Sequence, residues 1–222
     1  EDKLDYISIC SPNYLHYPHI KYSLRTRVDV ICEKPLVLTL EDLDKLIKEE
    51  ANSGKRVFTI LQLRLHPAII SLKEKVQNSE LKKEVDLTYI TSRGKWYHKS
   101  WKGERNKSGG IAMNIGIHFF DMLHWVFGKV ESIEVQSHSK ETAKGKIILE
   151  KAEVDWLLSI DSNQLPEVVK NSGQTTYRSI TIEGEEMKAW KGVVITTYQE
   201  ELTVLADTKE EAEVLMYDRA NP

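Results

Sequence analysis

The first 61 residues alternate between short apolar runs and longer segments with helical periodicity. Apolar runs typical of strands occupy residues 5–10, 28–32 and 56–61. The segments between them, residues 14–25 and 40–52, have the pattern of helices. Thr39 is suited to cap the second helix and Gly54 to end it. Strand, helix, strand, helix, strand at this spacing predicts a parallel sheet with crossover helices.

The pattern changes after residue 64. Helices are expected at residues 68–78, 111–127 and 208–217. Strands are expected at residues 85–93, 130–138, 146–149, 153–159, 175–182 and 193–197. Residues 94–107, rich in Trp, Tyr and Lys, are expected to form a binding loop. We therefore predict an α/β protein: half of a doubly wound sheet in residues 1–64, then an α+β domain with a mainly antiparallel open sheet in residues 65–222.

Three polar clusters follow the three apolar runs of the first domain. They are Ser11-Pro12-Asn13, Glu33-Lys34-Pro35 and Gln62-Leu63-Arg64. Ligands of open α/β sheets bind at the carboxyl ends of the strands, so these clusters predict a ligand site. No Gly-x-Gly-x-x-Gly turn occurs, although a dinucleotide site needs one for the pyrophosphate. The sequence is therefore expected to contain the second half of a dinucleotide-binding (Rossmann) sheet, with its first half absent.

A polar column is predicted on the largely apolar helix that follows Gly109-Gly110. Asn114, His118 and Asp121 are four and three residues apart, which stacks them along one side of an α-helix. Two readings are open: a core histidine held by Asp121 or by a main-chain carbonyl, or a histidine used in chemistry.

The composition of the chain limits the classes of binding partner that are expected. The 222 residues carry a net charge of −3 with 41% apolar and 29% charged residues, which is ordinary for a globular protein. No basic stripe points to nucleic acid, and no apolar run approaches the ~20 residues that span a bilayer. Cys10 and Cys32 are expected to be buried free thiols, which favours the cytoplasm. No metal-ligand spacing occurs, so no metal site is expected.

The motifs, in this order, resemble those of the glucose-fructose oxidoreductase / inositol dehydrogenase / MocA family. The matching residues are Ser11-Pro12-Asn13 with His16, Glu33-Lys34-Pro35, and Gly109-Gly110 leading to Gly116-Ile117-His118 and Asp121. Residues 61–67 and 93–103 look most like the UDP-N-acetylglucosaminuronate 3-dehydrogenases of that family, here without the start of the cofactor domain.

The resemblance implies a role for each matched residue. Lys34 and His118 would be catalytic, at the junction of nicotinamide and sugar, with Asn114 beside them. The cofactor would contact Ser11, Asn13, His16, Glu33, Lys34, Gln62 and Trp101. The substrate would contact Lys34, Arg64, Tyr97, Lys102, Asn114 and His118. Many family members have Asp where Asn114 stands, and an amide cannot relay a proton, so the role of base falls to His118.

The sequence therefore leads to one main hypothesis. The chain is expected to be an NAD-dependent dehydrogenase, with NADP not excluded, that oxidises a hydroxyl of a nucleotide-activated sugar. Two alternatives stay open: a non-catalytic binding or assembly module that lacks the glycine-rich turn, and a sibling dehydrogenase of a free polyol such as inositol. The resemblance also implies a homo-oligomer, a dimer or tetramer, through the C-terminal sheet. It does not extend to residues 190–222, which lack the family's usual closing segment.

Overall fold

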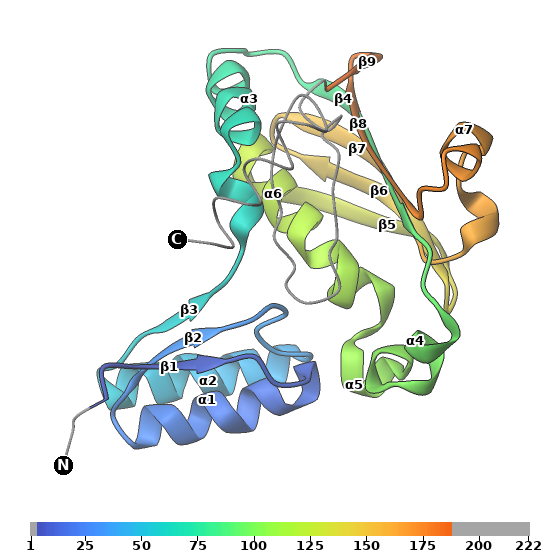
Figure 1. Ribbon diagram of the computed structural model, residues 1–222. Coiled ribbons are helices and arrows are strands. Elements are labelled where there is room, and N and C mark those ends of the chain that lie inside the picture. Colours follow the sequence, from blue (N-terminus) through green and yellow to red (C-terminus); the bar gives the residue numbers. More distant parts are fainter. Residues whose placement is uncertain (1–3, 188–222) are drawn as a thin grey trace, which may run out of the picture.

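The first layer of the structure is a three-stranded parallel sheet with two helices on one side (Figure 1). The computed structural model describes residues 4–187. The strands are β1 (Tyr6–Ile9), β2 (Asp29–Cys32) and β3 (Val57–Thr59), in the spatial order β1-β2-β3. The helices are α1 (His16–Arg25) and α2 (Leu40–Ser53). Both helices lie on the same face because consecutive crossovers that run in one direction have the same hand. The parallel sheet with crossover helices agrees with the prediction from the sequence.

The ends of α2 follow from its flanking residues. The Thr39 hydroxyl accepts a hydrogen bond from the amide of Asp42 at 3.1 Å, and Gly54 takes the left-handed conformation with φ of 65°. Glu41 lies in the first turn, where its charge suits the helix dipole. The apolar faces of the helices cover the sheet and form a small core with Ile9, Val30 and Cys32. Cys32 is buried, whereas Cys10 just beyond β1 is exposed, so the expectation of two buried thiols was wrong for Cys10.

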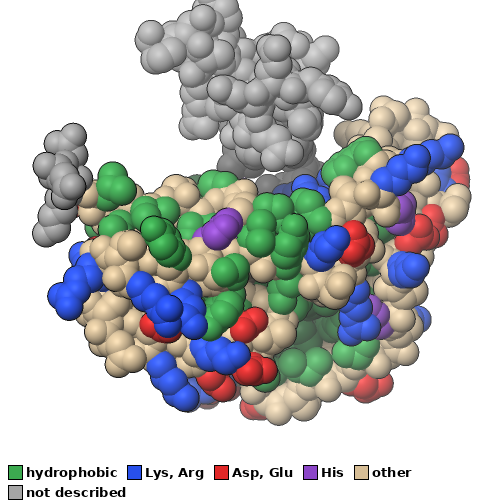
Figure 2. Space-filling view, turned by 90° about the horizontal axis from the view of Figure 1, so that it is seen from below, with side chains coloured by type: hydrophobic (Ala, Val, Ile, Leu, Met, Phe, Trp, Pro, Cys, Tyr) green, Lys and Arg blue, Asp and Glu red, His purple; other side chains and the backbone are tan. Residues whose placement is uncertain are grey.

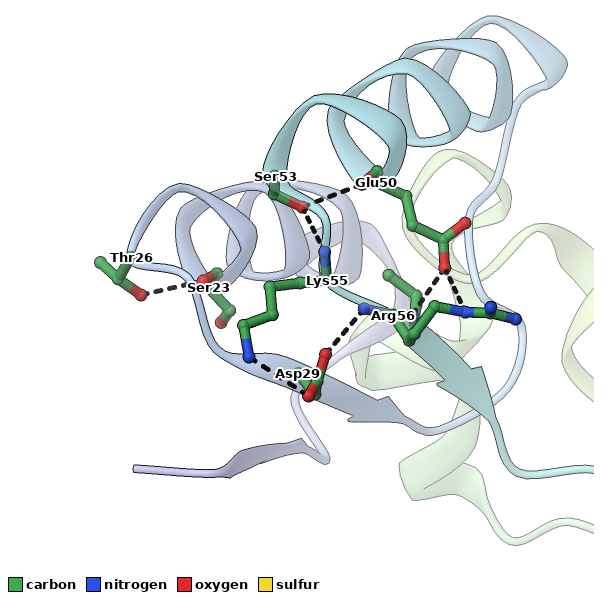
Figure 3. A network of polar contacts seen from close by, with 8 residues as sticks. Ser23, Thr26, Asp29, Glu50, Ser53, Lys55 and Arg56 are labelled. Carbon is green, nitrogen blue, oxygen red and sulfur yellow. Dashed lines mark hydrogen bonds and ion pairs between the residues drawn. The ribbon is translucent and has the colours of Figure 1, made fainter. Parts of the chain in front are cut away.

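A polar network joins the starts of β2 and β3 (Figure 3). One carboxylate oxygen of Asp29 accepts from the amide of Arg56 at 2.8 Å, and the other from the ammonium of Lys55 at 3.4 Å. The Glu50 side chain accepts from the amide of Val57 at 2.9 Å. The amide of Arg56, followed by the charge of Lys55, lowers the pKa of Asp29 below its usual value. These bonds fix the ends of the strands that lie away from the polar clusters.

The second layer is a six-stranded mixed sheet with the order β5-β6-β7-β4-β8-β9. Its strands are β4 (Lys83–Thr91), β5 (Val130–His138), β6 (Thr142–Leu149), β7 (Ala152–Ser159), β8 (Thr176–Ile182) and β9 (Glu185–Glu186). Only β4 and β7 pair in parallel; the other neighbours are antiparallel. This confirms the predicted mainly antiparallel sheet. The expected strand at 193–197 and helix at 208–217 lie outside the described residues.

Helices cover both faces of this second sheet unequally (Figure 1). Helices α3 (Pro67–Gln77) and α6 (Ile117–Phe127) lie on one side, and the short α7 (Glu167–Asn171) lies on the other. The buried side of α6 supplies Phe119, Met122, Leu123 and Val126 to the main core. The chain passes from the first sheet to the second between β3 and α3, and the division after residue 64 remains our proposal.

The segment between β4 and α6 differs from the prediction. Residues 94–107 were expected to form a loop, but they contain the short helices α4 (Lys95–Lys99) and α5 (Arg105–Ser108) and a 3-10 turn at Trp101–Gly103. Helices this short have too few apolar positions to show a period. The predicted helix at 111–127 begins with a wider π turn, Ala112–Gly116, before α6.

Candidate active site

The three polar clusters meet at one edge of the parallel sheet. Ile9 of β1 is in register with Cys32 of β2, which is in register with Thr59 of β3. Ser11 and Asn13, Glu33 and Lys34, and Gln62 and Arg64 follow these strand ends directly. The helix that carries His118 starts opposite this edge. The site is therefore built between the two layers, from residues far apart in the sequence.

Lys34 crosses from the first layer to the second. Its ammonium donates a hydrogen bond of 2.7 Å to the main-chain carbonyl of Asn114, which lies in the π turn. Burial lowers the pKa of Lys34, and the positive charges of Lys102 and Arg93 lower it further, while Glu33 opposes them. An ammonium has three N–H donors, so two remain for other acceptors.

The side chain of Asn114 is held at both ends. Its oxygen accepts from the amide group of Asn13 at 3.3 Å, and its nitrogen donates to the hydroxyl of Tyr97 at 3.2 Å. Asn13 also donates to the main-chain carbonyl of Ser108 at 2.9 Å. Asn13 is buried, so this chain of bonds positions the first layer against the start of α6. Asn114 thus connects elements and has no proton of its own to exchange.

His118 lies four residues beyond Asn114, at the first turn of α6. Its Nδ1 atom is buried and has no hydrogen-bond partner among the described residues. Burial, followed by the positive charge of Lys34, lowers the pKa of His118 from 6.5 to about 4, although Asp121 acts in the opposite direction. The imidazole is therefore neutral near pH 7 and has a ring nitrogen that can accept a proton.

Asp121 does not hold His118, although the spacing allowed that. Its carboxylate forms a two-pronged ion pair with Arg64: Nε donates to Oδ2 at 2.7 Å, and Nη2 donates to Oδ1. The Asp121 side chain is 10% exposed and the Arg64 side chain 37%. The pair joins the segment after β3 to α6. Asp121 engages two of the five N–H donors of Arg64, and a contact of Arg64 with the substrate stays a prediction.

His16 and Ser11 support the ends of the strands. His16 is fully buried, and its two ring nitrogens lie 2.7 Å from the carbonyl oxygen of Pro35 and 2.8 Å from that of Ser11. The imidazole thereby links the segment after β1 to the segment after β2. The Ser11 hydroxyl lies 3.0 Å from Nδ1 of His19, a histidine that the sequence reasoning did not single out. Any effect of His16 on a cofactor would pass through the loops that it positions.

The remaining candidates lie at the rim of the site. Gln62 is exposed at the start of the 3-10 turn Gln62–Leu65. The Lys102 ammonium lies 5.7 Å from the ring centre of Trp101 and 5.5 Å from that of Trp96. Tyr97 is buried beneath them. The structure thus joins Lys34, Asn114 and Tyr97 by hydrogen bonds and brings His118 within the electrostatic influence of Lys34, whereas Gln62 stands outside this group.

Comparison with known proteins decides the family. Residues 1–61 match the model of an oxidoreductase family described as its NAD-binding Rossmann fold, and residues 73–219 match that family's C-terminal alpha/beta domain. The chain belongs to the Gfo/Idh/MocA family of oxidoreductases. The resemblance noted from the motifs is confirmed, and so is the fold. The family match runs to residue 219, so the expectation that the resemblance does not extend into residues 190–222 was wrong.

Several members of this family are similar to the chain. The WlbA (WbpB) dehydrogenase from Thermus thermophilus, solved in complex with NAD and alpha-ketoglutarate, is 45% identical with a TM-score of 0.80; the match covers 97% of this chain and 65% of that one. The D-glucoside 3-dehydrogenase of Escherichia coli is 31% identical over 62% of this chain and 40% of its own length. The myo-inositol 2-dehydrogenase of Thermotoga maritima is 31% identical over 58% and 38%.

These comparisons also bear on the cofactor. The chain spans about two thirds of the Thermus protein and about two fifths of the two bacterial relatives. Residues 1–61 belong to an NAD-binding domain, and their donor groups fit a nucleotide. The donor groups of Ser11 and Lys34 stand at the carboxyl ends of adjacent parallel strands, where open sheets bind nucleotides.

Among the described residues, no helix is both long and apolar enough to cross a membrane.

Proposed function

We propose that this chain is part of an NAD-dependent dehydrogenase that oxidises a hydroxyl of a nucleotide-activated sugar, of the UDP-N-acetylglucosaminuronate type. One observation carries the proposal: Lys34 is bonded to the residue one turn before His118, whose neutral, buried imidazole has an unpartnered nitrogen. The Thermus dehydrogenase has also been solved with NAD and UDP-GlcNAcA, and it is 44% identical to this chain in that complex.

The residues of the site divide the reaction between them. When bound, NAD supplies the acceptor for the hydrogen and the electron pair that leave the sugar carbon. His118 accepts the hydroxyl proton as the O–H bond breaks and the C=O bond forms. A free N–H of Lys34 donates to the same oxygen and stabilises the negative charge that develops there. Asn114 keeps Lys34 and His118 in register by holding the π turn in place.

Replacement of the base tests the mechanism. We expect His118→Ala in the complete protein to lower turnover about 10²- to 10⁴-fold, because the proton then has no positioned acceptor. The measurement is NADH formation with a UDP-sugar acid as substrate. His124→Ala is the matched control, since His124 is exposed on the same helix, and it should keep its turnover. Unchanged turnover in His118→Ala would remove this residue from the mechanism.

The identity of the substrate needs a separate comparison, because polyol dehydrogenases are also relatives. We expect the UDP-sugar acid to be oxidised with a much higher kcat/KM than myo-inositol or a free glucoside. The reverse order would favour the sibling polyol dehydrogenase. If the 222-residue chain binds no NAD in a calorimetric titration, the reading as a non-catalytic module gains support for the chain on its own.

A further inference from the structure

A cavity of about 320 Å³ lies between the segment of α4 and α5 and the turn that joins β5 to β6. Its side chains include Tyr97, His98, Lys102, Arg105, His138 and Lys140. Two of them converge on Gly110: a Cβ placed there would lie 3.6 Å from Cγ of Arg105 and 3.9 Å from Nε2 of His138. The volume is at the lower limit for small-molecule pockets, so the cavity has room for part of a large ligand.

The lining is strongly basic. It contains three cationic side chains and two histidines, and none of the lining residues is acidic. In the described part of the chain, neither Arg105 nor Lys140 forms an ion pair with a carboxylate. A counter-charge at its edge is Glu141, whose carboxylate lies 3.4 Å from Nε2 of the lining residue His98. Figure 2 shows basic and histidine side chains, with acidic side chains among them, on one side of the molecule. Uncompensated cations around a cavity favour an anionic occupant.

Two residues that line the cavity also interact with residues of the proposed reaction centre. The hydroxyl of Tyr97, which lines it, accepts the hydrogen bond of the Asn114 side chain. Lys102 lines it too, and is near enough to Lys34 for its charge to act on that ammonium. Ile111 in the lining stands one turn before Ile115 on the segment that leads to His118. A ligand bridging the two places would therefore put its anionic part in the cavity and its hydroxyl at His118.

We propose that this cavity binds an oxyanion of the sugar-nucleotide substrate, with Arg105 and Lys140 as its main donors. The inference rests on the proposed function, because that function supplies two oxyanions: the diphosphate and the uronate carboxylate. A planar guanidinium binds each of these oxyanions through two parallel hydrogen bonds, whereas an ammonium binds them as a point charge. The number of cations favours the diphosphate, which carries more charge. None of these residues except Tyr97 and Lys102 was singled out from the sequence.

Direct binding tests the cavity without any need for turnover. UDP is titrated into the 222-residue chain by calorimetry, without NAD, at low salt. We expect Arg105→Gln and Lys140→Gln each to weaken UDP binding about tenfold or more, since each removes a charged hydrogen bond. Lys48→Gln is the matched control, because it removes the same charge from an exposed position of α2, and it should bind as the unchanged chain does. Arg105→Lys keeps the positive charge but loses the planar guanidinium, so its affinity for UDP should lie between that of Arg105→Gln and that of the unchanged chain.

Two further ligands identify the source of the anion. Uridine, which has no phosphate, should bind far more weakly than UDP if the diphosphate occupies the cavity. If glucuronate binding is weakened by Arg105→Gln and Lys140→Gln while UDP binding is not, the carboxylate is the occupant and the oxyanion site stands. The inference is overturned if neither ligand binds, or if both variants bind like Lys48→Gln.

The outcome is separable from that of the proposed function. If the variants lose UDP affinity but the protein reduces NAD with no sugar, the anion site is supported and the dehydrogenase function is contradicted. If the protein oxidises a UDP-sugar and its KM is unchanged by Arg105→Gln and Lys140→Gln, the dehydrogenase function is supported and the anion site is contradicted.

Discussion

His118 combines two properties that suit a general base: a ring nitrogen without a hydrogen-bond partner among the described residues and a neutral ring. Burial and the charge of Lys34 both disfavour the imidazolium. The same environment makes the histidine expensive to protonate in the folded chain. This links the proposed chemistry to a measurable dependence of stability on pH.

The pKa of His118 predicts how stability changes in mild acid. In the folded chain it is about 4, below the 6.5 of the unfolded chain, so the unfolded chain binds more protons between these values. The free energy of unfolding should therefore fall as the pH is lowered from about 6.5 to about 4. Urea denaturation of the unchanged chain and of His118→Gln measures this contribution. The slope over this range should be smaller in His118→Gln and unaltered in His124→Gln; equal slopes in all three would contradict it.

Single-residue roles were partly visible in the sequence. Lys34, Asn114 and His118 were singled out by their place after a strand or on a helix. The structure bonds Lys34 to the main chain of Asn114, one turn before His118, and their roles stay predictions. The partner of Asp121 could not be foreseen, because Arg64 is 57 residues away in the sequence while His118 is only three. Local spacing favours the near neighbour, and a two-pronged bond to a guanidinium is stronger than that local pairing.

At the scale of elements, the Arg64–Asp121 pair holds α6 to the segment after β3. Loss of one partner leaves a charge that is largely shielded from water, so Arg64→Gln should destabilise the chain. We expect about 1–2 kcal/mol, because the Arg64 side is partly exposed and screened. The charge-swapped pair Arg64→Asp with Asp121→Arg should recover part of this loss.

The measurement is the free energy of unfolding in urea, with an exposed ion pair as the reference. Lys45→Gln breaks the i,i+4 pair of Lys45 with Glu41 on α2, and no measurable loss is expected there. If Arg64→Gln were as stable as Lys45→Gln, the pair would not be what joins α6 to the first layer.

Most element boundaries followed from local signals, and the exceptions have physical reasons. Thr39 and Gly54 delimit α2 because they satisfy its ends. Strand β6 begins at Thr142, four residues before the predicted start at Lys146. In the structure Gly145 lies within the strand: a Cβ there would overlap the carbonyl oxygen of Glu134 and come 2.8 Å from the Trp156 ring. The glycine permits a close approach of neighbours, which sequence alone does not distinguish from a turn.

At the scale of the whole molecule, β5 is an edge strand of the second sheet, and none of the described residues covers it. All nine residues of β5 are exposed, including Ile133 at 62% and Val135 at 57%. Apolar side chains on an outer strand of a large sheet are suited to pairing with another copy. This supports our prediction of a homo-oligomer, a dimer or tetramer, through the C-terminal sheet.

The oligomer prediction is tested by placing a charge on that strand. Val135→Glu should convert the assembly to a smaller species, as measured by light scattering coupled to size exclusion. Val168→Glu is the control: Val168 is 79% exposed on α7, away from β5. A chain that is monomeric before any substitution, or an assembly that Val135→Glu leaves intact, would contradict the prediction.

The bonds of Lys34, Asn13 and Arg64 have a consequence for motion. All three side chains reach from the first layer to the stretch between Ser108 and Asp121, and the same stretch carries His118. A movement that parted the layers to admit a large ligand would have to release these bonds, and it would carry the imidazole away from the ammonium in the same step. The open molecule would thus be inactive. Activity would return only when closure brought the ammonium of Lys34 and the imidazole of His118 together again.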